Sequence, residues 1–155
     1  MSLCALPPGS SFILASFQDL LAEHVEVALY LTMLVGAGGN AGNQAAVHVI
    51  RELAVSKGSA RISLLRELGI ALCVGTLVTW VGFARVLLFE GSLKTTVAIS
   101  LALFAITCSS IVLGSVLPLA FRRVGLDAAH AGPTIQVFMD ISGVFITCLV
   151  CSRVL

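Results

Sequence analysis

The sequence predicts an all-α, polytopic bundle of membrane-spanning helices. Of its 155 residues, 58% are hydrophobic and only 11% are charged, whereas soluble domains carry about 25% charged residues. This number of charges is too small to cover the surface of a soluble domain. We therefore expect the chain to lie in a lipid bilayer. The net charge of +1 gives no electrostatic footprint for nucleic acid, which is not an expected partner.

Four apolar stretches are long enough to cross a hydrocarbon core, which needs about 20 residues per helix. They run approximately over residues 27–50, 68–89, 95–121 and 133–155. Residues 12–17 are apolar but too short to span, and we interpret them as the end of a truncated earlier helix or as an interfacial piece. We therefore expect an N-terminal segment over residues 1–24 and a transmembrane domain of about four spans over residues 25–155.

The basic residues orient these spans. The connections at residues 51–66 and 122–130 together hold Arg51, Lys57, Arg61, Arg66, Arg122 and Arg123. Two spans separate the connections, so both lie on one side of the membrane, and the positive-inside rule makes that side cytoplasmic. Arg85, about one turn before the end of the second span, is expected to snorkel to the opposite interface. The plasma membrane is the favoured location.

The first span contains the string GAGGNAGNQ at residues 36–44. In hydrocarbon every backbone N–H and C=O needs a partner, so this string is either a helix packed closely on another or irregular backbone lining a water-filled path. Gly38 and Gly42 form a GxxxG packing motif. Packing explains the glycines but not the amides, because amides inside a membrane need polar partners. On a helix, small and amide positions share one broad face that offers neutral oxygens (Gly36, Gly39, Asn40, Asn43 and Gln44).

The third span carries Ser110 and Gly114, whose small-xxx-small spacing predicts close helix packing. In the fourth span, Asp140 is the only carboxylate well inside a predicted membrane segment, where a charge costs about 2.5 kcal/mol or more. A polar stripe surrounds it on one helical face (Gln136, Gly143 and Thr147). Asp140 is therefore either a structural residue bonded to another helix or an ion-binding residue.

The ion that suits such a site is a hard one. One carboxylate with amide and carbonyl oxygens lacks the Cys and His ligands that favour zinc or copper. Mg²⁺ keeps several of its waters and is held by one or two carboxylates. A divalent cation moving inward also gains about 4.6 kcal/mol per 100 mV, and the sequence has no GxxxxGK[ST] motif for ATP.

Three strings, GAGGNAGNQAAVHVIRELA, LPLAFRRVGLD and AGPTIQVFMDISGVFI, resemble the membrane domain of the MgtE magnesium channel family. Eukaryotic solute-carrier divalent cation transporters carry related domains. The resemblance covers approximately residues 13–155. It implies a homodimer, or pairing with a second MgtE-like half, with a pore between subunits along the first and fourth spans.

The resemblance also implies roles for individual residues. Asp140 corresponds to the residue that holds hydrated Mg²⁺ in the pore, and Gly38, Gly39 and Asn40 flank it. Gly36 stands where some members carry an acidic residue, and we count it with Gly39, Asn40 and Asp140 as metal-binding positions. Glu67 matches an acidic residue with a gating or ion-sensing role. The expected pore-lining positions are Gly38, Asn43, Gln44, Gln136, Gly143 and Thr147.

The function expected from these features is passive transport of Mg²⁺, or of other divalent cations, across a membrane. Two alternatives stay open: a non-conducting accessory or half subunit, and a proton-coupled divalent cation transporter, because a membrane-buried Asp can titrate near neutral pH. An enzyme is not expected, since paired intramembrane aspartates of the GxGD type, HExxH and a Ser/His pair at depth are all missing. Mg²⁺ is expected as the transported ion, with no organic cofactor.

Overall fold

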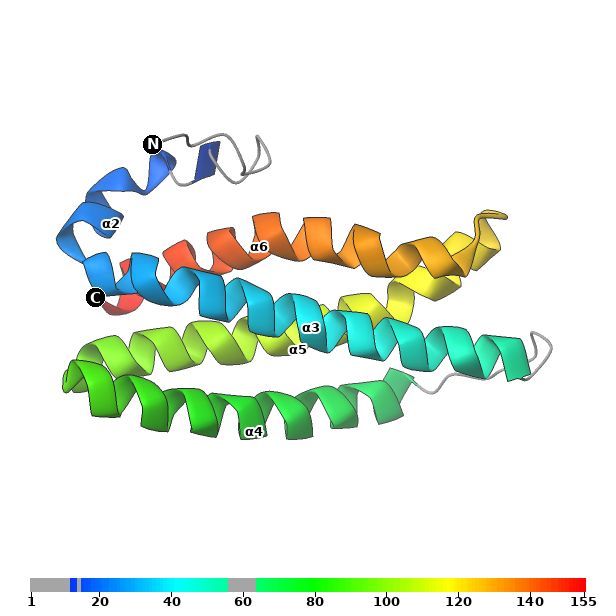
Figure 1. The fold of residues 1–155 in the computed structure, drawn as a ribbon, viewed down its shortest axis with the longest axis horizontal. Helices are drawn as coiled ribbons and strands as arrows, with labels where there is room; N and C mark the ends of the chain where they lie inside the picture. Colours follow the sequence, from blue (N-terminus) through cyan, green and yellow to red (C-terminus); the bar gives the residue numbers. More distant parts are fainter. Residues whose placement is uncertain (1–11, 14, 56–63) are drawn as a thin grey trace.

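The computed structural model describes residues 12, 13, 15–55 and 64–155, and every regular element among them is a helix (Figure 1). The elements are α2 (Gln18–Glu23), α3 (Val25–Val55), α4 (Leu64–Glu90), α5 (Leu93–Arg123), the 3-10 helix η1 (Ala128–His130) and α6 (Ala131–Val154). The predicted all-α bundle is therefore confirmed. Residues 1–11 of the expected N-terminal segment, and Lys57 and Arg61 of the first basic connection, lie outside the described residues.

Each predicted span falls on one long helix, except that Leu155 follows the end of α6. Within the described residues, three segments are long and apolar enough to cross a membrane: Gly69–Glu90, Leu93–Arg123 and Ala128–Val154. α3 is as long as α5, at 31 residues, but the amides and glycines in its middle lower its hydropathy. Because α3 lies alongside α5 and α6 in Figure 1 and packs on both, we treat it as the fourth membrane helix.

The core lies between α3, α5 and α6. Its largest fully buried side chains come from all three helices (Leu34, Ile99, Ile106, Ile135 and Met139). α4 packs chiefly on α5 and forms one edge of the bundle in Figure 1. Large apolar side chains point outward along α4, such as Leu77 and Leu88 at 67% and 84% exposure. This outward face is the kind of surface that acyl chains cover in a bilayer.

Short connections set the helices antiparallel. α4 passes into α5 through Gly91, whose φ of +67° lies in the left-handed region that favours glycine. Ser92 then caps α5, because its side chain accepts a hydrogen bond from the Thr95 backbone N–H at 3.4 Å. Between α5 and α6, Asp127 caps η1 by accepting from the Ala129 N–H at 2.9 Å. The two turns connect α4 to α5 and α5 to α6, and α6 also packs on α3.

Candidate functional site

The glycine-rich string of α3 is continuous helix, which is the first of the two conformations that the sequence allowed. Its buried side packs on α5. The Ser110 hydroxyl donates a hydrogen bond to the Gly38 carbonyl oxygen. A Cβ added at Gly42 would lie 2.8 Å from the Ser110 carbonyl oxygen, and one added at Gly114 would collide with the Gly42 carbonyl oxygen. The packing predicted for the Gly38–Gly42 and Ser110–Gly114 pairs is therefore confirmed.

The opposite side of the same string is open. Asn40, Asn43 and Gln44 are all exposed in the single chain, and a Cβ added at Gly36 would meet nothing within 4 Å. No described residue forms a hydrogen bond with any of the three amide side chains. Since an amide facing hydrocarbon without a partner is costly, this amide face (Gly36, Asn40, Asn43 and Gln44) requires water, an ion or another subunit.

Asp140 of α6 is connected to α3 through Gln136. Its side chain is half-buried, and its Oδ1 accepts a hydrogen bond from Gln136 Nε2 at 3.0 Å. The Gln136 side chain lies over Gly39, where an added Cβ would be 2.8 Å from Gln136 Nε2. The absence of a side chain at Gly39 thus leaves the space in which Gln136 holds the Asp140 carboxylate next to α3.

A second contact joins the same two helices nearer the start of α6. A Cβ added at Gly132 would lie 2.7 Å from Asn43 Oδ1. The amide of Asn43 therefore sits against the backbone of α6, about one turn from Gln136. Together the two contacts bring Gln136 and Asn43 to the junction of α3 and α6, with Asp140 bonded to Gln136. Carboxylate and amide oxygens of this kind suit a hard cation.

Three of the expected pore-lining residues lie inside helix contacts of the single chain. Gly38 is buried against Ile106 of α5 and Met139 of α6. Gly143 is buried against Val35, whose Cγ2 would be 3.1 Å from an added Cβ. Thr147 is fully buried and donates to the Gly143 carbonyl oxygen at 2.8 Å. The open part of the α6 stripe is therefore its first half, at Gln136 and Asp140.

Glu67 lies in a groove between α3 and α4 that has a volume of about 440 Å³. The residue is only 4% exposed, and its Oε2 accepts from the Ser115 hydroxyl of α5 at 3.2 Å, a hydroxyl shared with the Ile111 carbonyl oxygen at 2.9 Å. Asn40, Gln44 and His48 line the same groove, so the amide face continues to Glu67. His48 is not among the site residues expected from the sequence, although its i+4 spacing from Gln44 is a signal for this shared side.

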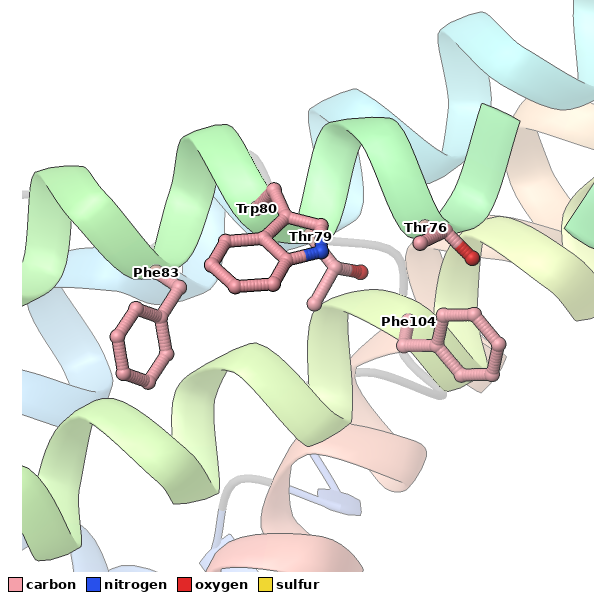
Figure 2. A pocket seen from close by; sticks show the side chains of 5 residues that line it. All are labelled: Thr76, Thr79, Trp80, Phe83 and Phe104. Atoms are coloured by element: carbon pink, nitrogen blue, oxygen red, sulfur yellow. The ribbon is translucent and has the colours of Figure 1, made fainter. Parts of the chain in front are cut away.

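A different groove, between α4 and α5, carries no such chemistry. Figure 2 shows the five residues that line it: Thr76, Thr79, Trp80, Phe83 and Phe104. The Trp80 and Phe83 rings meet edge to face with centroids 6.4 Å apart. None of these lining residues is charged, so this groove is a mostly apolar surface without a carboxylate for a cation.

Comparisons with known proteins identify relatives of the chain. The sequence profile of the MgtE family, described as a divalent cation transporter, matches residues 31–150. The chain is 30% identical to the magnesium transporter MgtE of Thermus thermophilus over 141 residues, which cover 88% of this chain and 31% of that protein.

Two further relatives show the same pattern. The magnesium transporter MgtE of Enterococcus faecalis is 26% identical, with 94% of this chain and 33% of that protein covered. The magnesium transporter MgtE of Bacillus subtilis is 25% identical, with 88% and 31% covered. The chain spans about a third of the length of these relatives. The range that the family profile matches includes both the amide face and Asp140.

Proposed function

The chain belongs to the MgtE family of divalent cation transporters, and on this premise we propose that it passes Mg²⁺ across a membrane along the amide face of α3. The observation that carries the proposal is the Asp140 carboxylate, held by Gln136 at 3.0 Å beside an open row of amides. A carboxylate at this depth is costly unless a partner compensates its charge. A divalent cation supplies that compensation.

The ion would keep most of its water shell. In a continuous helix the backbone carbonyls already accept intrahelical hydrogen bonds, so the oxygens free for an ion are the side chains of Asp140 and Asn40, with Gly36 and Gly39 leaving room beside them. Mg²⁺ gives up its waters reluctantly. Waters bridging the ion to carboxylate and amide oxygens therefore suit Mg²⁺ better than direct ligation, and Asn43, Gln44 and Gln136 would line its path.

Glu67 is proposed as the residue that couples this path to gating or ion sensing. Its buried carboxylate is bonded to Ser115 of α5 and lines the groove that also holds Asn40 and Gln44. A cation entering this groove would compete with Ser115 for the carboxylate. We place the end of the bundle that carries the basic connections at residues 51–66 and 122–130 in the cytoplasm, following the positive-inside rule.

Mg²⁺ uptake into liposomes that contain the purified full chain tests the function. With a membrane potential that is negative inside the liposome, we expect uptake above that of protein-free liposomes, because a passive path needs no other energy source. Varying the pH gradient at fixed voltage separates this path from a proton-coupled transporter, whose flux would follow the pH gradient. No uptake at any voltage would contradict the proposal for this chain alone and favour the accessory or half-subunit function.

A second copy of the chain is the proposed cover of the amide face. Its three amides find no partner among the described residues, and two copies facing each other would enclose them around one ion path with two Asp140 carboxylates. We expect Asn43→Cys to be joined into dimers by a bis-maleimide linker in membranes. Leu77→Cys, on the outward face of α4, is the matched control, because both variants keep all native cysteines. Equal linking of the two variants would contradict a dimer across the amide face.

A further inference from the structure

A small amphipathic groove lies at the end of the bundle where α4 turns into α5. It has a volume of about 330 Å³ and is lined by Leu29, Tyr30 and Met33 of α3 and by Arg85, Phe89 and Glu90 of α4. The Tyr30 hydroxyl lies within electrostatic range of both Glu90 and Arg85. This groove lies on the same α3–α4 side as the amide face but nearer the start of α3, and none of its lining residues is among those proposed for the ion path.

Arg85 is available for a ligand. Its side chain is exposed, and none of its five guanidinium donors forms a hydrogen bond or ion pair within the described part of the chain. Arg85 lies five residues before the last residue of α4, about 7.5 Å deeper along the helix than Glu90. A long cationic side chain at this depth extends toward the interface, where the phosphates of lipid headgroups lie.

Glu90 supplies the opposite charge nearer the aqueous phase. It is exposed at the helix end, just before the tight turn at Gly91. A carboxylate has about four acceptor sites, so the interaction with Tyr30 leaves others free. From the hydrocarbon outward, the groove therefore presents apolar side chains, then a cation and then an anion.

We propose that this groove binds a phospholipid with a phosphoethanolamine headgroup. Arg85 would hold the phosphate by charge-assisted hydrogen bonds, which Arg makes in bidentate form. Glu90 would accept hydrogen bonds from the primary ammonium, and the acyl chains would lie over Leu29 and Phe89, which are 70% and 77% exposed. Phosphatidylglycerol has the same phosphate but no ammonium to place against Glu90, and a choline headgroup has no N–H to donate.

Native mass spectrometry of the full chain in detergent, with equal amounts of phosphatidylethanolamine, phosphatidylglycerol and phosphatidylcholine, tests this site. For the unchanged protein we expect phosphatidylethanolamine to bind about tenfold more tightly than the other two lipids, the effect of one charge-assisted contact. Arg85→Gln should lower phosphatidylethanolamine binding by about tenfold. Glu90→Gln should instead remove the preference over phosphatidylglycerol while the phosphate is still bound.

Arg153→Gln is the matched control, because Arg153 is an exposed arginine in the last turn of α6 at the same end of the bundle (Figure 1). It should bind all three lipids as the unchanged protein does. Equal binding of the three lipids by the unchanged protein, or an equal loss in the Arg85 and Arg153 variants, would overturn the proposal. The ratio of two lipids is measured within each preparation, so the lipid preference of Glu90→Gln can be measured even if part of that preparation is unfolded.

Discussion

Asp140→Asn is expected to reduce Mg²⁺ uptake into liposomes by more than about a hundredfold. At a separation of about 6 Å and an effective dielectric constant of about 20, a divalent cation and a carboxylate attract each other by roughly 5 kcal/mol. Each 1.4 kcal/mol corresponds to about tenfold in occupancy. Asparagine has nearly the same shape and can still accept the hydrogen bond from Gln136 Nε2 that Asp140 Oδ1 accepts at 3.0 Å. The substitution therefore removes the charge with little change in packing.

Asp127→Asn is the control for this experiment. Asp127 is an exposed carboxylate that caps η1 through the Ala129 N–H, and asparagine caps a helix about as well as aspartate. Uptake by this variant should equal that of the unchanged protein. Uptake in the Asp140 variant that stays within a few-fold of the unchanged level would show that Asp140 is a structural residue.

The sequence predicted the helices well because their signal is local. Each apolar run of about 20 residues has few solutions in a bilayer other than a helix. The helices extend beyond the predicted spans by several residues at some ends, such as Val55 of α3 and Leu64 of α4. These ends carry charged residues, which mark where a helix leaves the hydrocarbon but do not stop it from continuing.

The candidate site was predictable in its residue types but not in its pairings. Gly38 and Asn40 stand two residues apart, yet one is buried against α5 and α6 and the other is exposed. The pattern grouped both with the pore because composition does not tell which side of α3 receives a neighbour. Likewise, the bond from Ser115 to Glu67 joins residues 48 positions apart, and only the fold brings them together.

Thr147 of α6 is another residue whose contacts the sequence pattern did not predict. Its i+7 spacing from Asp140 placed it on the polar stripe, but its hydroxyl donates to the Gly143 carbonyl oxygen of its own helix. A buried threonine can satisfy its hydroxyl in this way without any partner helix. A polar residue at helical spacing is therefore weaker evidence for a pore than an amide, which cannot be satisfied so locally and is found here on the open face.

Gly114→Ala is expected to destabilise the bundle by about 3 kcal/mol, the upper part of the range for overpacking. The new Cβ would collide with the Gly42 carbonyl oxygen and would lie 2.9 Å from the Gly42 carbonyl carbon and 3.1 Å from Ala45 Cβ. Two of these three atoms belong to the backbone, so no side chain can rotate away and α3 must move from α5. That movement also weakens the hydrogen bond from Ser110 to Gly38, one turn along the same contact.

Unfolding in sodium dodecyl sulfate, followed by the fluorescence of the single tryptophan, Trp80, measures this loss. Gly69→Ala is the matched control, because Gly69 is an exposed glycine of α4 where an added Cβ meets nothing within 4 Å. Alanine there should be neutral or stabilising by up to about 1 kcal/mol, since it favours helix over glycine. Equal unfolding midpoints for the two variants would mean that α3 and α5 do not meet backbone to backbone. The amide face would then have no rigid support, because the Gly42–Gly114 contact fixes the side of α3 that faces away from α5.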